Sequence, residues 1–308
     1  MFIIKNKKIF LLISIFLVVA SVVIISLFGL KIGIDFKGGA LTEVSYPDGR
    51  PEISILKDAT KDLSLGEITF QPSGTNDYIV KSKDLTDPEH TTLLQALSAK
   101  GTLKIEEKNF NSIGPSVGKE LKKKSMFSIF FVILAVILFI AYAFRKVSKP
   151  ISSWKYGPIA IIALLHDITI PIGVMGMLGH FAGAEVDTLF VVALLTILGI
   201  SVADTIVVFD RIRENLRLKI SSDFHETVGR SIDQTFTRSI NTSLTVIFVL
   251  LSLFFFGPES TRNFALIMTI GLFFGTYSSI FLASPLLVYA YEIQEKMQAK
   301  KGNKKNKK

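Results

Sequence analysis

Six long hydrophobic stretches, separated by charge-rich segments, constrain this chain more than any other feature. Each stretch is close to the roughly 20 residues that an α-helix needs to cross about 30 Å of hydrocarbon. We therefore predict a polytopic α-helical membrane protein with six transmembrane helices. The stretches cover approximately residues 9–30, 126–144, 157–178, 187–209, 239–257 and 262–290.

The first stretch follows Lys5, Lys7 and Lys8 and runs from Ile9 to about Leu30. The hydrophobic part of a cleaved signal peptide has only about 7–15 residues, and a small-residue cleavage site follows it. This stretch is longer, and no clear site of that kind comes after it. We therefore predict an uncleaved signal anchor.

Basic residues predict the orientation of the six helices. They crowd the N-terminus, the segments after the second and fourth stretches, and the C-terminal tail, but the short segments 180–186 and 257–261 carry no lysine or arginine. The positive-inside rule assigns the basic segments, and with them both termini, to the cytoplasm. Lys119 and Lys122–Lys124 form the one cluster that disagrees. Beyond the N-terminus, the basic residues that agree are Arg145, Lys146, Lys149, Lys155, Arg211, Arg213, Arg217, Lys219, Arg230, Lys300, Lys301, Lys304, Lys305, Lys307 and Lys308.

The net charge of the sequence is +9, and it contains no cysteine. Without cysteine, disulfides, Fe–S clusters and cysteine-based zinc sites are excluded. The excess positive charge lies beside hydrophobic stretches and in the tail, where membrane topology explains it better than nucleic-acid binding does. We expect no cofactor, no metal and no nucleic-acid partner.

Residues 31–120, between the first two stretches, have the composition of a soluble domain. Alternating patterns and helix boundaries in this segment predict the order β-α-β-β-α-β, which is typical of a small α+β ferredoxin-like domain. We predict that this domain lies outside the cytoplasm. The predicted strands are 41–46, 67–71, 78–82 and 102–108, and the predicted helices are 52–63 and 88–100.

These patterns divide the chain into four parts. Residues 1–30 would form the cytoplasmic N-terminus and first helix, and residues 31–120 the extracytoplasmic domain. Residues 121–292 would form a bundle of five transmembrane helices, and residues 293–308 a basic cytoplasmic tail.

Asp204 lies inside the fourth hydrophobic stretch. A carboxylate within a membrane helix costs about 2.5–3.5 kcal/mol on insertion scales, so its presence suggests a function. Thr196, Ser201 and Thr205 fall near the same helical face, and Gly199 would allow a neighbouring helix to approach. This pattern favours a proton- or ion-binding carboxylate in the bundle interior over one that snorkels or caps near the interface.

Arg238 begins a polar stripe on the fifth helix, with Thr242, Thr245 and Ser252 at helical spacing. A guanidinium here can be a fixed cation near Asp204, or it can be a plain positive-inside anchor. The spacing alone leaves both interpretations open.

His166 and Asp167 are adjacent in the third helix. The pair can relay protons, or it can hold a helix end by hydrogen bonds to the backbone, and the structural role is slightly favoured. In the sixth helix, Gly271, Gly275 and Ser279 follow one another at four-residue spacing. That spacing predicts a packing face, for a neighbouring helix of this chain or for a partner protein.

Six ordered motifs give the chain a resemblance to a known family. The chain resembles the SecD/SecF family of protein-export membrane proteins along nearly its whole length. The motifs are Gly33-Ile34-Asp35-Phe36-Lys37-Gly38-Gly39, Ile113-Gly114-Pro115-Ser116-Val117, His166-Asp167-Ile168, the segment from Asp204-Thr205 to Glu214-Asn215, Arg238-Ser239-Ile240-Asn241-Thr242-Ser243, and Gly275-Thr276-Tyr277-Ser278-Ser279.

The resemblance implies an RND-like fold in the bacterial inner membrane. It also implies a six-span partner, SecD, and work beside the SecYEG channel and other Sec accessory proteins on a translocating unfolded polypeptide. The family's ion-coupling aspartate and arginine fall on Asp204 and Arg238, and proton or sodium flow would drive late translocation. Ile200 and Ala203 stand where the family usually has tyrosine and asparagine. This difference leaves open whether the coupled ion is a proton or sodium.

Three other functions compete with this interpretation. One is an RND-type exporter of small molecules or lipids, but the short predicted domain argues against it. Another is an intramembrane aspartyl protease, for which Asp167 and Asp204 would be the pair, although no Gly-x-Gly-Asp motif lies in any stretch. The third is a structural scaffold, in which Asp204 would be dispensable. We expect a translocase subunit that is not an enzyme, with Ser201, Thr205 and Thr242 in support of the ion site.

Overall fold

The computed structural model describes residues 2–143 and 155–305, with side chains described up to residue 299. Arg145, Lys146 and Lys149 of the predicted cytoplasmic loop lie outside the described residues, as do Lys307 and Lys308 of the tail. The side chains of Lys300, Lys301, Lys304 and Lys305 also lie outside them.

The described residues contain six helices that are long and apolar enough to cross a membrane, which confirms the prediction of six spans. Long continuous runs of apolar residues produce these helices, because a backbone in lipid must satisfy its hydrogen bonds within the helix. The six are α2 (Lys7–Phe28), α6 (Pro115–Ala143), α7 (Tyr156–Ala182), α8 (Thr188–Leu218), α9 (Phe224–Phe256) and a last span that begins with α10 (Glu259–Tyr277).

The chain folds into two compact units. The helical unit comprises Met1–Lys31, Ser128–Ala184 and Leu189–Lys308, and the sheet unit comprises Ile32–Phe127 and Glu185–Thr188. The helix α6 belongs to both, because its first turns lie in the sheet unit and its apolar part lies in the helical unit.

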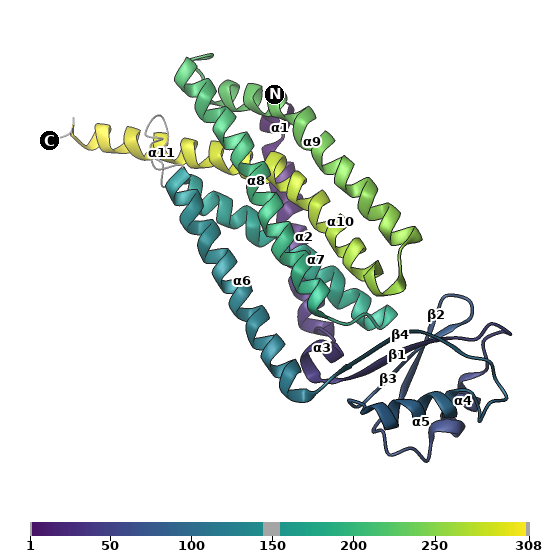
Figure 1. Ribbon diagram of the computed structural model, residues 1–308. Helices are drawn as coiled ribbons and strands as arrows, with labels where there is room; N and C mark the ends of the chain where they lie inside the picture. The colour runs from purple at the N-terminus through teal and green to yellow at the C-terminus, as the bar shows by residue number, and fades with distance from the viewer. Residues whose placement is uncertain (1, 144–154, 306–308) are drawn as a thin grey trace. The chain divides into compact units, whose positions relative to one another are not determined.

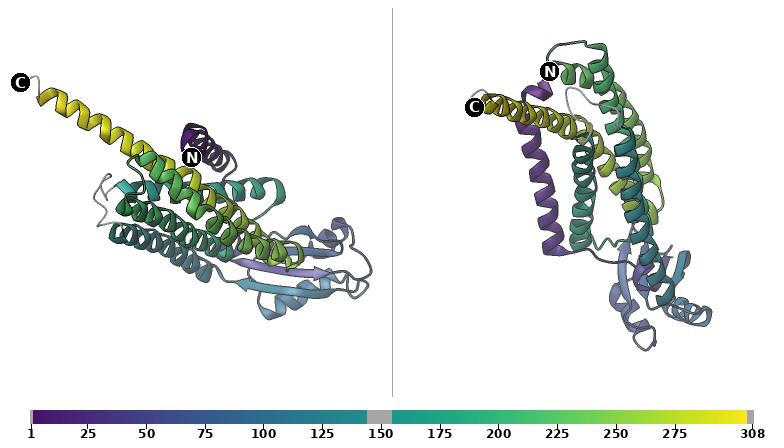
Figure 2. Two further views of the ribbon diagram at one scale, coloured as in Figure 1. Left: turned by 90° about the horizontal axis from the view of Figure 1, so that it is seen from above. Right: turned by 90° about the vertical axis from the view of Figure 1, so that its left-hand side faces the viewer.

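Within the helical unit, α7, α8 and the last span are the most buried, and α2, α6 and α9 expose most of their apolar surface. The helix α10 packs against α9 and α7, and α2 packs against α7 (Figure 1; Figure 2). At the contact between α2 and α7, a Cβ added at Gly173 would lie 2.5 Å from the Cβ of Ser21. The glycine is therefore needed for the close approach of these two helices.

The last span is interrupted, a feature that its hydrophobicity does not predict. After α10, residues Ser278–Ala283 form a π-helix (η2), and α11 (Ser284–Lys305) continues beyond it. Figure 2 shows α11 extending beyond the other helices of the unit, with the C-terminus at its far end. π-Helical turns are rare and occur frequently at functional sites.

One end of the helical unit brings the two terminal regions of the chain together. The short helix α1 (Phe2–Lys5) contacts both α9 and α11. Lys7 at the start of α2 forms an ion pair with Glu292 on α11, and His225 on α9 lies 2.9 Å from the same carboxylate. The start of the first span and the end of the last span are therefore on the same side of this unit.

The sheet unit contains a four-stranded antiparallel sheet in the order β2-β3-β1-β4. Its elements follow the predicted order of strands and helices, after the short helix α3 (Ile34–Lys37). Apolar residues of the strands pack against α4 and α5, with Val44, Leu56, Leu93 and Leu97 almost fully buried. The elements are β1 (Gly39–Ser45), α4 (Ile53–Thr60), β2 (Thr69–Ser73), β3 (Asp77–Ser82), α5 (Asp87–Leu97) and β4 (Glu106–Ile113).

The prediction of the last strand at residues 102–108 is wrong in its position. The strand β4 begins at Glu106 and pairs with β1 as far as Ile113. Leu103 and Ile105 alternate as strand residues do, but they pack against the core from a segment that precedes the strand. Their partial burial against this core, and not strand pairing, explains the apolar alternation.

The linker between α7 and α8 belongs to the sheet unit. Its Val186 forms a parallel bridge with Ile32, and the Val186 carbonyl accepts a hydrogen bond of 2.9 Å from the Gly33 amide. The Thr188 amide donates a hydrogen bond of 2.8 Å to a carboxylate oxygen of Asp35. The motif that begins at Gly33 therefore binds the start of α8.

Candidate functional site

Asp204 on α8 is half-buried and faces α9 through one carboxylate oxygen. Its Oδ1 accepts a hydrogen bond of 2.5 Å from the hydroxyl of Ser239 on α9. Its Oδ2 is buried and has no hydrogen-bond partner among the described residues. An unsatisfied carboxylate oxygen in such a place is costly, so it is suited to take up a proton or another cation.

A second carboxylate, Asp167 on α7, is fully buried. Its Oδ1 lies 2.8 Å from Nδ1 of His166. Its Oδ2 accepts hydrogen bonds from Ser201 on α8 and, at 2.7 Å, from Ser278 in the π-helix. Asp167, in the middle of α7, is thus hydrogen-bonded to side chains of other helices, and neither it nor His166 caps a helix end.

Two pairs of hydroxyl groups form hydrogen bonds between these helices. Thr205 on α8 and Ser279 in the π-helix form a hydrogen bond of 3.0 Å between their hydroxyls. Ser243 on α9 and Thr276 on α10 form another hydroxyl pair. Hydroxyls can both donate and accept, so this layer can adjust when a carboxylate gains or loses a proton.

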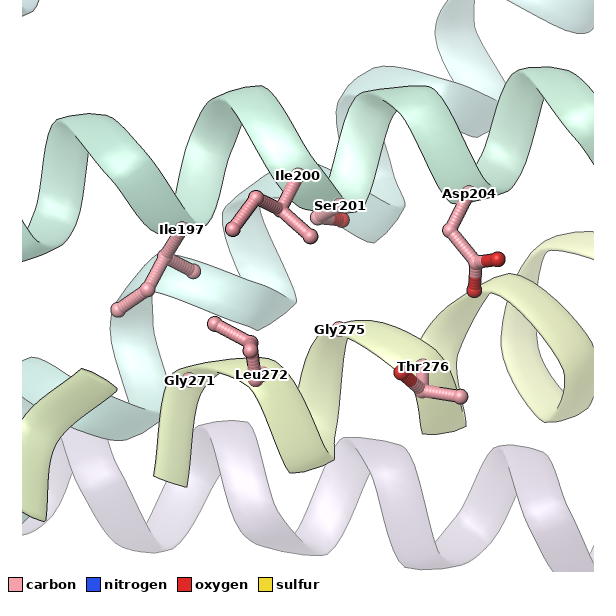
Figure 3. A pocket seen from close by; sticks show the side chains of 8 residues that line it. All are labelled: Ile197, Ile200, Ser201, Asp204, Gly271, Leu272, Gly275 and Thr276. Atoms are coloured by element: carbon pink, nitrogen blue, oxygen red, sulfur yellow. The ribbon is translucent and has the colours of Figure 1, made fainter. Parts of the chain in front are cut away.

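A cavity of about 10 Å³ opens beside Asp204. This volume is close to the roughly 10–15 Å³ that a single water molecule needs. Figure 3 shows that the Asp204 carboxylate points from α8 toward α10, with Ser201 one turn away on the same helix. The lining residues are Ile197, Ile200, Ser201, Asp204, Gly271, Leu272, Gly275 and Thr276.

The small residues of the last span pack against α8 of this chain. The sequence had left open whether they pack against a helix of this chain or against a partner protein. A Cβ added at Gly271 would lie 2.1 Å from Cδ1 of Ile197, and one added at Gly275 would lie 3.3 Å from Cβ of Ser201. These glycines bring α10 close to α8 and so enclose the site around Asp204.

The structure does not join Arg238 to Asp204. The side chain of Arg238 is exposed in the isolated chain, and within the described residues it forms no ion pair with Asp204. Thr242 is also exposed, and its hydroxyl donates a hydrogen bond of 2.9 Å to the Arg238 carbonyl. Ser239, and not Arg238, makes the hydrogen bond to Asp204, although the guanidinium lies near enough to interact with that carboxylate electrostatically.

The sequence reasoning therefore missed Ser239 and Ser278 as members of the site. Each serine lies in one of the six ordered motifs, Ser239 next to Arg238 and Ser278 next to Ser279. A hydroxyl within a hydrophobic helix is a weak signal, because it can bond to its own backbone as well as to another helix.

Comparisons with known proteins agree with this architecture. The family model described as "Protein export membrane protein SecD/SecF, C-terminal" matches residues 93–293. This chain belongs to the SecD/SecF family. Protein translocase subunit SecF of Thermobaculum terrenum is 40% identical over 93% of this chain and 92% of the relative. The subunit SecF of Anaerolinea thermophila is 38% identical over the same shares.

A solved structure of the family gives the same fold. The crystal structure of SecDF from Thermus thermophilus, called a translocon-associated membrane protein, matches with a TM-score of 0.77 and 30% identity. The match covers 93% of this chain but only 38% of the SecDF chain. A structure of SecDF in a super-membrane-facing form matches with a TM-score of 0.64, over 98% of this chain and 39% of SecDF.

Proposed function

We propose that this chain is an auxiliary subunit of the Sec protein-export machinery that uses an ion gradient, together with SecD, to promote late translocation and release of secreted polypeptides. The observation that carries the proposal is the similarity to translocase subunits along almost the entire chain, with Asp204 enclosed in its membrane helices. The SecYEG channel, the unfolded polypeptide and other Sec accessory proteins would be its further partners.

A polar stripe on α9 supports the proposal that a partner protein covers this helix. Arg238, Asn241, Thr242 and Thr245 are all exposed in the isolated chain, next to the apolar part of this helix. Polar groups that face lipid are costly, so another protein should cover this face. The match of this chain to about two-fifths of SecDF makes SecD the natural partner. In the complex, Arg238 would act as a fixed cation for the ion pathway.

In this proposal Asp204 binds the coupling ion, a proton or sodium. Ser201 and Thr205, on the same helix, support it from the hydroxyl layer, and Asp167 with His166 supports it from α7. Thr242 supports the position of Arg238 through the backbone. The chain would do this without catalysing a chemical reaction and without a cofactor or nucleic acid.

The proposed topology places a ferredoxin-like domain, residues 31–120, outside the cytoplasm. Residues 1–30 and 121–292 form the membrane part, and residues 293–308 form the cytoplasmic tail in the bacterial inner membrane. The contact of α1 with α11 supports the assignment of both termini to one side, and the basic residues support the cytoplasmic side.

Reconstitution in vesicles tests the function. Vesicles that contain the SecYEG channel, SecD and this chain should release a translocating polypeptide faster when a proton or sodium gradient is imposed. Vesicles without SecD should show no such stimulation. Full gradient-dependent activity of this chain without SecD would contradict the proposal that it is half of a transport unit.

A further inference from the structure

The π-helix η2 gives the site two adjacent serines that are both fully buried. Ser278 and Ser279 are each 0% exposed. Ser278 donates a hydrogen bond to Asp167 on α7, and Ser279 is bonded to Thr205 on α8. Neighbouring side chains of a helix point about 100° apart. The two serines of the π-helix can therefore bind α7 and α8 at the same time.

Ser201 makes a similar connection from α8. Its hydroxyl donates a hydrogen bond to Oδ2 of Asp167, and it lines the cavity that Asp204 also lines (Figure 3). The cavity has room for about one water molecule between these groups. Asp167 and Asp204 therefore share Ser201 as a neighbour: its hydroxyl binds Asp167, and its side chain lines, together with Asp204, a small cavity whose walls are mostly apolar.

Protonation of Asp167 requires these hydroxyls to rearrange. An ionised carboxylate only accepts hydrogen bonds, and Oδ2 of Asp167 now accepts two, from Ser201 and Ser278. When a proton binds to Oδ2, that oxygen becomes a donor and one of the two serines must accept. The Ser278 hydroxyl has an alternative acceptor in the Gly275 carbonyl, 3.0 Å away, which Ser279 also uses.

We propose that Asp167 is a second ion-responsive carboxylate, and that Ser201, Ser278 and Ser279 are positioning residues that couple its protonation to that of Asp204. The proposal rests on the proposed ion-coupling function of Asp204. It assigns Asp167 a role in the ion cycle beyond support of the helix packing.

Other ionisable groups surround the two carboxylates. His166 on α7 contacts Asp167, and Tyr277 on α10 stacks on the His166 ring with 6.0 Å between ring centroids. Arg238 on α9 precedes Ser239, which binds Asp204. These groups remain in every variant below, so a change between variants reports the carboxylates and the serines.

Infrared difference spectroscopy of the complex with SecD in vesicles tests the coupling. The C=O stretch of a protonated carboxyl is followed against pH, and the Asp204 band is identified by its loss in Asp204→Asn. In Asp167→Asn, the proton affinity of Asp204 should change about tenfold or more, because strongly interacting groups titrate as a pair. An unchanged midpoint for Asp204 would overturn the proposal.

Single serine variants test whether the serines couple Asp167 to Asp204. They also test the proposal if Asp167→Asn fails to assemble. Ser278→Ala removes a donor to Asp167 and adds no volume. It should change the proton affinity of Asp204 by about two- to thirtyfold, the range of coupling that intermediate residues contribute. Thr269→Ala is the control, because among the described residues this hydroxyl on α10 binds the Ala265 carbonyl of its own helix.

The results separate the two proposals. If Asp204→Asn abolishes gradient-driven export but neither Asp167→Asn nor Ser278→Ala moves the Asp204 midpoint, the coupling is wrong and the proposed function stands. If Asp204→Asn leaves gradient-driven export intact, the proposed function is wrong whatever the spectra show.

Discussion

Ser239 on α9 donates a hydrogen bond of 2.5 Å to Asp204 on α8, whereas Arg238, the preceding residue, is exposed. A hydrogen bond to a charged group contributes about 1.5–3 kcal/mol, more than one to a neutral group. Protonation of Asp204 therefore weakens this contact between α8 and α9. The bond is a direct means by which ion binding changes how the two helices pack.

The first prediction concerns that hydrogen bond. Ser239→Ala should lower the gradient-dependent part of export about tenfold, because an ionised Asp204 loses a bond of this strength. The rate of polypeptide release from vesicles with and without a gradient measures the effect. Thr235→Ala is the matched control, because among the described residues that buried hydroxyl on α9 binds the Ser231 and Ile232 carbonyls of its own helix. Equal behaviour of the two variants would show that the Ser239 bond has no role in coupling.

The second prediction concerns the packing of α2 on α7. Gly173→Ala places a Cβ 2.8 Å from the Cα of Ser21, a backbone atom that cannot turn aside. Overpacking of this kind costs about 1–3 kcal/mol, so the melting temperature of the purified chain in detergent should fall. Gly199→Ala is the control, because an added Cβ there meets no atom within 4 Å. A melting temperature for Gly173→Ala that matches Gly199→Ala would contradict this contact.

The third prediction concerns acid stability of the sheet unit. A hydrogen bond of 2.6 Å from Lys83, with others from Thr86, lowers the pKa of Glu89 from 4.5 to about 2. A lowered pKa stabilises the fold at pH values above 4.5, and this stabilisation is lost as the pH falls toward 2. The Thr86–Glu89 capping box starts α5, so this helix should open more readily as the pH falls.

Pepsin, which is active in acid, measures that opening. Cleavage within α5 of the full chain should accelerate between pH 4.5 and 2, relative to Glu89→Gln measured in parallel. The variant has no carboxyl to protonate at this position, so its own pH dependence reports the protease and the other carboxyls of the chain, such as Asp77 and Asp87. A constant ratio of the two cleavage rates across this range would show that Glu89 contributes nothing to acid stability.

The fourth prediction concerns topology. The chain has no cysteine, so single cysteines can be introduced without background. Thr75, in the turn between β2 and β3, and Ser222, between α8 and α9, are both exposed. Thr75→Cys should react with a membrane-impermeant maleimide in intact spheroplasts, and Ser222→Cys only after permeabilisation. The reverse pattern would invert the proposed orientation of all six spans.

The sequence predicts much of this fold because the length of a hydrophobic stretch is enough to locate a membrane-spanning helix. All six spans follow from it, and the alternation in residues 41–46 and 78–82 locates two central strands. The buried face of Ser201 and Thr205 follows from helical spacing. The prediction of the last strand failed because Leu103 and Ile105 are partly buried against the core without belonging to a strand.

Helix rotation and local irregularity explain what the sequence could not predict. Arg238 and Ser239 are adjacent, and only the packed helix decides which of them faces Asp204. Hydropathy does not distinguish a π-helix from an α-helix, so the joint role of Ser278 and Ser279 was not predictable. The four residues Glu185–Thr188 carry no periodic signal, yet they pair with the segment around Gly33.

The central claim is that Asp204 couples ion movement to export, and its replacement tests this most directly. Asp204→Asn keeps the size of the side chain and removes the titratable group. Asp210→Asn is the control, because Asp210 is exposed on the same helix and lies 3.7 Å from Arg213. Both variants are reconstituted with SecD and SecYEG, and polypeptide release is measured with and without proton and sodium gradients. We predict that Asp204→Asn assembles but loses all gradient-dependent release, and that Asp210→Asn retains it. Full gradient-dependent release by Asp204→Asn would contradict the account.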